Sequence, residues 1–437
     1  MKWNPARRAL SALAAVALAG AAAVALLSLP WRAERPFTPP SVTSVAAGNG
    51  PLQAGMAVRP LDLGPAPTIG GFPRWRWKAE GVRDPLGARA LVLEEPGARV
   101  ALVSVELLLI PDALDAAVRA RVADLGLDAL LLAATHTHSG PGGYWDSLAG
   151  RVGATGPYHP AAFARLVDDV VAALRAAAAA RGPATLAVLR AHLEGLTRNR
   201  NGADADGRLV VVRLARPTGE PVAELIGFSA HPTFLGKANR QVSGDWPGRL
   251  LAAGARGPRL FFQGAIGDQS VRLPPTAVSP GEAPHAAYAR LLGDSIDALA
   301  SEPAAWTPRL AVASATVTLP TIAPGAVPGW LRPATRSLLG GLLPATARVT
   351  AVRLGPLLLL ATPAEPVEAV GRAWREAAGP DAELLSLAGG YVGYVETAAR
   401  FDAGEGEARR SYYGPELAAR LEAAVVAAAR AADAAPR

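Results

Sequence analysis

Two histidines separated by a single residue are the strongest chemical signal in the sequence. Residues 134–144 read ATHTHSGPGGY, so His136 and His138 directly follow the apolar run 129–133. Side chains two apart at a strand end point to the same side, and the glycines that follow let backbone approach a ligand closely. Sites in α/β proteins commonly lie where a strand opens into such a loop. Two surface histidines before a turn are the alternative, and we favour a functional pair.

Any metal in this chain must be held by histidine or oxygen ligands, because the sequence contains no cysteine and only six histidines. His231, in the segment FSAHPT, ends a second apolar run and is a candidate third imidazole. Glu365, in TPAEP, lies where a strand gives way to a helix, and Tyr391 and Tyr394 lie three apart in GGYVGYV. Taken singly, these residues have ordinary explanations: a core histidine, a helix-start carboxylate and packing tyrosines.

Two further segments carry polar side chains that could act on a bound ligand. Residues 263–270, QGAIGDQS, place Asp268 and Ser270 on a glycine-containing loop after an apolar run. Residues 198–201, RNRN, offer Arg200 as a clamp for an anion or a carbonyl oxygen. An ordinary turn is the alternative for both. The chain has no G-x-S-x-G serine elbow, no P-loop and no G-x-G-x-x-G nucleotide motif.

The elements that must position these residues form an alternating pattern of apolar runs and helical segments after residue 50. This pattern predicts an α/β fold with strands buried on both faces, in one sheet-based catalytic domain with flanking helices over residues 51–437. We predict strands at 89–94, 101–110, 129–135, 185–191, 209–214, 224–231, 260–264, 310–319, 349–354 and 357–362. We predict helices at 112–125, 161–181, 245–255, 287–299, 365–377 and 415–432.

The N-terminal 30 residues predict a hydrophobic helix. Lys2, Arg7 and Arg8 precede 21 uncharged residues, 9–29, which as a helix would span about 31 Å, close to a hydrocarbon core of about 30 Å. We favour a signal anchor over a cleaved signal peptide, because the run exceeds the usual ~7–15 apolar residues of a signal peptide. Either places the catalytic domain outside the cytoplasm, secreted if the helix is cleaved. Residues 31–50, rich in Pro, Ser and Gly, predict a linker.

The formal net charge of +7 comes from arginines that are dispersed along the chain. Nucleic-acid binding would require a basic stripe or a recognisable module, and neither is present. Weak attraction to an anionic membrane surface is the better interpretation of this charge. A composition of 50% hydrophobic and 19% charged residues excludes a disordered chain.

Read together and in order, these segments resemble the neutral/alkaline, non-lysosomal ceramidase family. The motifs are THTHSGPGG, NR, AHPT, GDxS, PAE and GYxGYV, preceded by the opening pattern GVRDPL and VSVE. Members of that family are zinc amidases that cleave the N-acyl bond of ceramide. The resemblance therefore implies a lipid-like amide substrate and a Zn²⁺ ion held by His136, His231, Glu365 and Tyr394. It also implies catalytic roles for His138, Arg200 and Ser270.

The attacking group remains open between Ser270 and a water activated by the metal. We favour water because no base for the serine is evident, and we expect His138 and Arg200 to stabilise the oxyanion. The chain departs from the family pattern at Gly406, where a tyrosine is common, and at Glu106, where aspartate is more usual. The alternatives are a zinc hydrolase of another N-acyl amine or ester and a non-catalytic binding protein.

Residues 325–344 have no evident place in a sheet. The segment reads GAVPGWLRPATRSLLGGLLP and gathers apolar side chains, among them Trp330 and Leu338, around Arg332 and Arg336. An exposed apolar patch beside arginines would let an enzyme meet a substrate that resides in a bilayer. A buried loop and helix is the equally weighted alternative.

Overall fold

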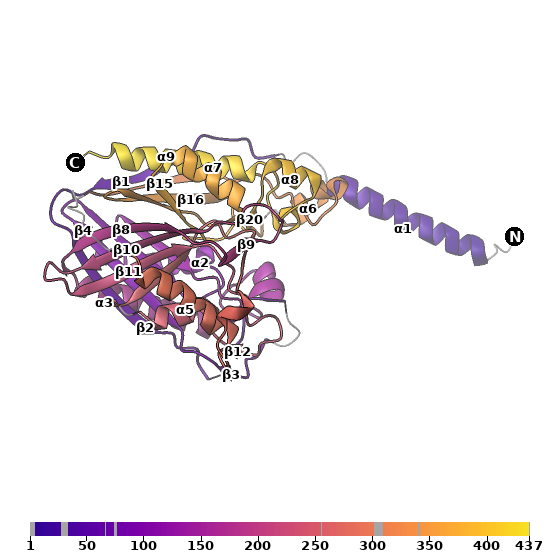
Figure 1. The fold of residues 1–437 in the computed structure, drawn as a ribbon. Coiled ribbons are helices and arrows are strands. Elements are labelled where there is room, and N and C mark those ends of the chain that lie inside the picture. Colours follow the sequence, from indigo (N-terminus) through magenta and orange to yellow (C-terminus); the bar gives the residue numbers. More distant parts are fainter. Residues whose placement is uncertain are drawn as a thin grey trace.

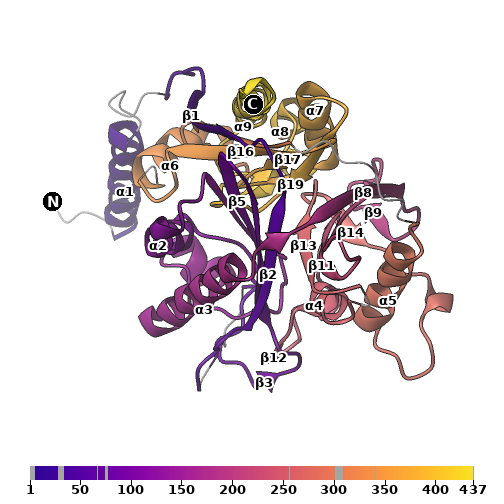
Figure 2. The ribbon, with the colours of Figure 1, turned by 90° about the vertical axis from the view of Figure 1, so that its left-hand side faces the viewer.

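Three β-sheets pack around one shared apolar core, and helices cover the outer face of each sheet (Figure 2). This computed structural model describes residues 5–27, 34–65, 67–73, 77–254, 256–300, 309–339 and 341–436. The central core takes side chains from all three sheets, for example Leu102, Leu225 and Val352. Separate apolar clusters lie between each sheet and its own helices. Most strands are therefore buried on both faces, which explains their nearly continuous apolar runs.

The first sheet has the strand order β6-β5-β4-β2-β7. Its members are β6 Ala129–Ala134, β5 Ala98–Val105, β4 Gly87–Glu95, β2 Gln53–Pro60 and β7 Gly182–Pro183. Alternate residues of β4 face opposite ways: Leu91 and Leu93 join the central core, whereas Ala90 and Val92 join the outer cluster. The outer face is covered by the helices α2 Asp112–Arg121 and α3 Pro160–Ala179.

The second sheet has the order β13-β11-β10-β8, and the third has the order β1-β15-β16-β17-β19. The second comprises β13 Arg259–Gln263, β11 Pro221–Phe228, β10 Arg208–Ala215 and β8 Thr185–His192, covered by α4 Asp245–Ala252 and α5 Pro284–Asp297. The third comprises β1 Ser41–Ala47, β15 Leu310–Thr318, β16 Thr346–Leu354, β17 Leu357–Ala361 and β19 Ala382–Leu385, covered by α7 Glu368–Ala378 and α9 Leu417–Ala434.

Three short strand pairs join loops at the edges of these sheets. They are β3 Gly81–Val82 with β12 Gln241–Val242, β9 Thr197–Asn199 with β14 Gln269–Val271, and β18 Glu365–Pro366 with β20 Tyr394–Val395. Two shorter helices complete the elements named here, α6 Arg332–Leu339 and α8 Ala398–Ala403. The pair β9–β14 joins the segment that carries Arg200 to the segment that carries Ser270. The pair β18–β20 joins Glu365 to Tyr394.

All ten predicted strands and six predicted helices are present, with shifted ends. The mixed α/β, sheet-rich class is confirmed. The predicted linker over residues 31–50 needs correction, because residues 41–47 form β1 and pair antiparallel with β15. Its sequence, SVTSVAA, contains β-branched residues that suit a strand.

Residues 5–27 form the predicted N-terminal helix, α1 Pro5–Leu27, which extends away from the three sheets (Figure 1). Alanine dominates this helix and contributes little apolar surface per residue. None of the helices in the described ranges combines the length and apolar character needed to cross a membrane. The predicted transmembrane anchor is therefore not supported.

Candidate metal centre

His136 and His138 face a common point, but not because they alternate along a strand. Strand β6 ends at Ala134, and His136 adopts a left-handed backbone conformation with φ of 70°. The Nδ1 atom of His136 donates to the carbonyl of Leu108 at 2.7 Å, and Nδ1 of His138 donates to the carbonyl of Gly71 at 2.7 Å. Their Nε2 atoms lie 3.3 Å apart. The predicted shared orientation is present, and the turn at His136 produces it.

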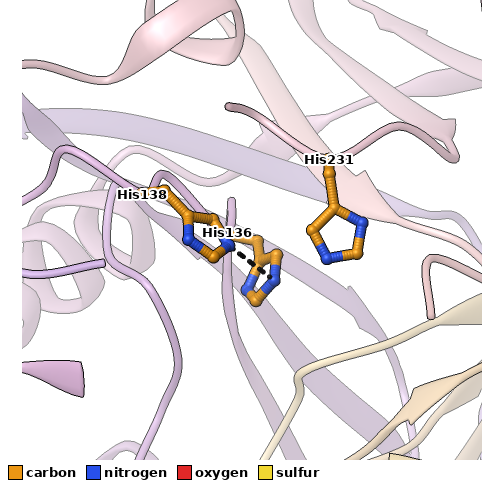
Figure 3. A group of neighbouring side chains, drawn as sticks. All are labelled: His136, His138 and His231. Atoms are coloured by element: carbon orange, nitrogen blue, oxygen red, sulfur yellow. Dashed lines mark hydrogen bonds between the residues drawn. The ribbon is translucent and has the colours of Figure 1, made fainter. Parts of the chain in front are cut away.

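His231 follows β11 and completes a group of three imidazoles (Figure 3). Its Nδ1 atom donates to the carbonyl of Gln269 at 2.8 Å. A carbonyl can only accept, so each ring carries a proton on Nδ1, and in a neutral ring Nε2 then carries a lone pair. Burial lowers the pKa of His231, and burial followed by the neighbouring imidazoles lowers the pKa of His138 well below its ordinary value. Both rings are therefore neutral near pH 7.

Glu365 and Tyr394 bring oxygen atoms to the same point from the parallel β18–β20 pair, in which they are register partners. Oε2 of Glu365 lies 3.2 Å from Nε2 of His136 and 3.5 Å from Nε2 of His231. The hydroxyl of Tyr394 lies 3.2 Å from Nε2 of His231. The side chains of His136, His231 and Glu365 are each only 2% exposed.

These four residues fit a metal ion. Oε2 of Glu365 is buried and has no hydrogen-bond partner among the described residues, although it faces two imidazole lone pairs. When the rings are neutral such an arrangement is repulsive, and a cation among the atoms removes the repulsion. Ligands bound at about 2.0–2.2 Å in a tetrahedron lie about 3.3–3.6 Å apart. The observed distances of 3.2–3.5 Å match that spacing.

The loops that carry the imidazoles are joined by Gln263, at the end of β13, which is completely buried. Its side-chain amide donates to the carbonyl of Thr135 at 3.0 Å and to that of Ala230 at 3.2 Å. Its side-chain oxygen accepts from the backbone N–H of Ala230 at 3.3 Å. Each of those residues directly precedes a histidine of the centre. Sequence reasoning missed this role, since a glutamine at a strand end carries no distinctive signal.

Arg200 lies beside Tyr394 but is bound by other groups. Its Nε atom donates to Oε1 of Glu407 at 2.6 Å, and Nη2 donates to the carbonyl of Gly267 at 2.6 Å. The guanidinium carbon lies 5.7 Å from the centre of the Tyr394 ring. Burial and the charge of Glu365 raise the pKa of Tyr394, and Arg200 acts in the opposite direction. Arg200 is not part of the cavity wall described below.

Ser270 belongs to β14, and its backbone forms a bridge with that of His231. The side chain is half-buried and is not part of the cavity wall. The structure therefore brings His136, His138, His231, Glu365 and Tyr394 together, whereas Ser270 and Arg200 are not among the residues that line the cavity.

An apolar cavity of about 560 Å³ opens beside the centre. Its wall includes His136, His138, Glu365, Tyr394 and many apolar side chains, namely Leu108, Leu109, Trp145, Ile322, Val327, Leu342 and Leu343. Leu148, Val152 and Leu342 line it while remaining 59%, 65% and 51% exposed, so they form an apolar rim. The segment 325–344 thus supplies part of this wall, and its Trp330 is 73% exposed. The side chain of Leu338 lies outside the described residues.

Both departures from the family pattern have a structural explanation. Gly406 has φ of 56°, a conformation that favours glycine, and a Cβ atom there would lie against Oε2 of Glu396. Oε1 of Glu106 occupies space that a Cβ atom on Gly244 or Gly248 would fill. Oε2 of Glu106 accepts a hydrogen bond from Nη1 of Arg89 at 2.7 Å. This contact lies at the end of strand β5, two residues before Leu108 in the chain. Glu106 is therefore accommodated by two glycines.

Comparison with known proteins gives concordant results. Residues 64–253 match the model of the family "Neutral/alkaline non-lysosomal ceramidase, N-terminal". The chain is 32% identical over 200 residues to a neutral ceramidase of Mycobacterium tuberculosis, which is 40% of this chain and 31% of that protein. It is 28% identical over 195 residues to a neutral ceramidase of Pseudomonas aeruginosa, 40% of this chain and 29% of that protein. The match thus spans about a third of the length of these curated relatives.

The fold agrees with a solved structure. The crystal structure of neutral ceramidase from Pseudomonas aeruginosa superposes with a TM-score of 0.74 at 21% identity, covering 87% of this chain and 74% of that one. A structure described as ceramidase complexed with C2 superposes with a TM-score of 0.73 at the same identity, covering 87% of this chain and 75% of that one. The resemblance drawn from the sequence motifs is confirmed by the family match and by these likenesses.

Proposed function

We propose that this protein is a zinc-dependent amidase that hydrolyses the N-acyl bond of ceramide or a similar lipid amide. The observation that carries the proposal is the buried, unpartnered Oε2 of Glu365, which faces two imidazole lone pairs at the end of an apolar cavity. The family match and the ceramidase relatives support this reaction class and substrate.

The zinc ion would be held by His136, His231, Glu365 and Tyr394. Imidazole nitrogens and anionic oxygens are ordinary ligands of zinc in proteins. When bound, zinc polarises the amide carbonyl and lowers the pKa of water toward neutrality. His138 is the one imidazole of the three that is not fully buried, so we assign it to the substrate side. Tyr391 fixes the carboxylate of Glu365 through a 2.7 Å hydrogen bond to Oε1.

His138 serves as a proton acceptor in this proposal and not as the expected oxyanion donor. Its Nδ1 proton is bound to Gly71, so neutral Nε2 can only accept. As the water oxygen bonds to the carbonyl carbon, a water proton passes to Nε2 of His138. The C–N bond then breaks and that proton passes to the leaving amine nitrogen, which gives a carboxylic acid and an amine.

Water is preferred over Ser270 as the attacking group, because the serine is not part of the cavity wall. Arg200 is assigned to positioning Tyr394, since Glu407 and Gly267 already engage its guanidinium. An acyl adduct on Ser270, trapped during turnover and detected by mass spectrometry, would contradict this assignment and restore a serine mechanism.

A lipid-like substrate is favoured over a small polar amide, because apolar side chains dominate the cavity wall and its rim. The decisive experiment measures zinc content and turnover together. We expect about one zinc per chain, loss of activity on chelation, and faster turnover of long-chain ceramide than of a short soluble N-acyl amine. Turnover of only the short amine would favour the alternative hydrolase, and zinc binding without turnover of either would favour a binding protein.

We also propose that the catalytic unit lies outside the cytoplasm. The basic N-terminus followed by the alanine-rich α1 supports export, and the protein would be secreted if the segment is cleaved. Fractionation of cells that express the full chain, with N-terminal sequencing of the product, tests this. A product found only in the cytoplasm with an intact N-terminus would contradict it.

A further inference from the structure

Tyr412 is a second phenol on the cavity wall, and its position is fixed by backbone contacts. Its carbonyl accepts from the N–H of Ala323 at 2.9 Å. Its ring lies against Gly393, where a Cβ atom would come within 2.7 and 2.8 Å of two ring carbons. Gly393 has φ of 86°, a conformation that glycine adopts readily. Gly393 therefore provides both the space and the turn that bring Tyr412 beside Tyr394.

The hydroxyl of Tyr412 has no hydrogen-bond partner among the residues that the structure describes, unlike the other two phenols on the wall. Tyr391 donates to Oε1 of Glu365 at 2.7 Å, and the hydroxyl of Tyr394 lies 3.2 Å from Nε2 of His231. Tyr412 is half-buried, and burial together with the charge of Glu365 raises the pKa of its phenol. The Tyr412 hydroxyl is thus a donor on the cavity wall whose hydrogen bond no residue in the described ranges receives.

Amide hydrolysis requires such a donor, because negative charge builds on the carbonyl oxygen as the tetrahedral intermediate forms. The two residues expected to supply it are engaged elsewhere: His138 presents only an acceptor, and Arg200 binds Glu407 and Gly267. Trp145 and Ser147 also carry donors on the wall, but both belong to the segment that forms the exposed rim with Leu148. Of the three phenols that line the cavity in the described part of the chain, Tyr412 is the one without a hydrogen-bond partner.

We infer that the hydroxyl of Tyr412 donates a hydrogen bond to the carbonyl oxygen of the scissile amide and stabilises the developing oxyanion. This inference rests on the proposed amidase function, and it adds a catalytic residue that the sequence motifs do not include. The hydrogen bond forms in the bound substrate and strengthens as the oxygen gains charge. Its loss is therefore expected to lower kcat more than it raises KM.

The test compares Tyr412→Phe with Tyr413→Phe. Tyr413 is a suitable control because it is adjacent, buried, and donates to the carbonyl of Pro344 at 2.8 Å. For Tyr412→Phe we expect kcat on ceramide to fall about 10²–10³-fold, the loss typical of one oxyanion donor, with zinc content unchanged. Tyr413→Phe should retain kcat within a few-fold. Unchanged kcat in Tyr412→Phe, or an equal loss in both variants, would overturn the inference.

A binding measurement separates this inference from the proposed function. Calorimetry on the zinc-loaded protein with a short-chain ceramide reports the ground-state hydrogen bond even if no turnover occurs. We expect Tyr412→Phe to weaken binding about 2–10-fold relative to Tyr413→Phe, since a neutral hydrogen bond contributes modestly. A wild-type protein that binds but does not hydrolyse would refute the amidase function alone. Equal affinity of the two variants would refute the role of Tyr412.

Discussion

The hydroxyl of Tyr391 donates to Oε1 of Glu365 at 2.7 Å, while Oε2 of the same carboxylate faces the imidazoles of His136 and His231. One oxygen is thus held by the protein, and the other is presented to a cation. Groups that orient a ligand in this way typically affect metal affinity by 10–100-fold.

We therefore expect Tyr391→Phe to weaken zinc binding by about 10–100-fold. Competition with a chromogenic chelator measures this directly. Tyr288→Phe is a matched control, because that phenol is also fully buried but donates to the carbonyl of Leu196. Equal zinc affinity in the two variants would show that Tyr391 does not orient Glu365.

Replacing single histidines should separate metal ligands from the proton acceptor. His136→Ala and His231→Ala each remove a nitrogen ligand and should abolish stoichiometric zinc, as measured by elemental analysis. His138→Ala should keep zinc but lose at least about 10²-fold in turnover, the usual contribution of a positioned base. If both ligand variants keep their zinc, the assignment of the centre is wrong.

Gln263→Leu should destabilise the fold and loosen the centre together. The change leaves the carbonyl of Thr135 and the backbone groups of Ala230 without their partners, at about 1–3 kcal/mol for each buried group. Denaturant unfolding of the metal-free protein measures the loss. The exposed residue Gln53 offers a control, Gln53→Ala, expected within about 0.5 kcal/mol of the wild type. A stable Gln263→Leu protein with normal zinc affinity would contradict this role.

Asp245 predicts a pH dependence of stability that is unrelated to the metal. Burial raises the pKa of this carboxyl to about 6. Between about pH 4 and pH 6 the folded state therefore binds more protons than the unfolded state, and the free energy of unfolding falls as the pH rises. The loss is about 3 kcal/mol and is complete above pH 6. Asp245→Asn should remove this slope, and an unchanged difference between pH 4 and pH 7 would contradict the prediction.

The apolar rim, together with the exposed Trp330 of the segment that carries Leu342, predicts a preference for substrate in membranes. Trp330→Ser combined with Leu342→Ser removes two exposed apolar side chains. We expect lower turnover of ceramide in vesicles and nearly unchanged turnover of a detergent-dispersed short analogue. Val82→Ser, an exposed valine of β3 outside the cavity wall, is the control. Equal losses on both substrates would indicate a folding defect.

Sequence patterns predicted the elements whose side chains are buried on both faces and the strand ends that carry histidines. They could not predict β1, because its residues are largely exposed and the stretch resembles a spacer. They also missed contacts that depend on three-dimensional packing, such as Gln263 with Thr135 and Ala230. The acceptor role of His138 depends on the carbonyl of Gly71, which lies 67 positions away in the chain.

The β18–β20 bridge has a consequence for how this protein can change over time. Glu365 and Tyr394 are adjacent across two short strands, whereas the chain between them forms α7 and β19. A side chain at Gly379, at the end of α7, would meet no atom within 4 Å. Extra residues there would lengthen the chain between Glu365 and Tyr394 without altering the β18–β20 bridge. An insertion at this one position would leave the two ligands in place, so the chain between them can grow at the end of α7 while the centre is kept.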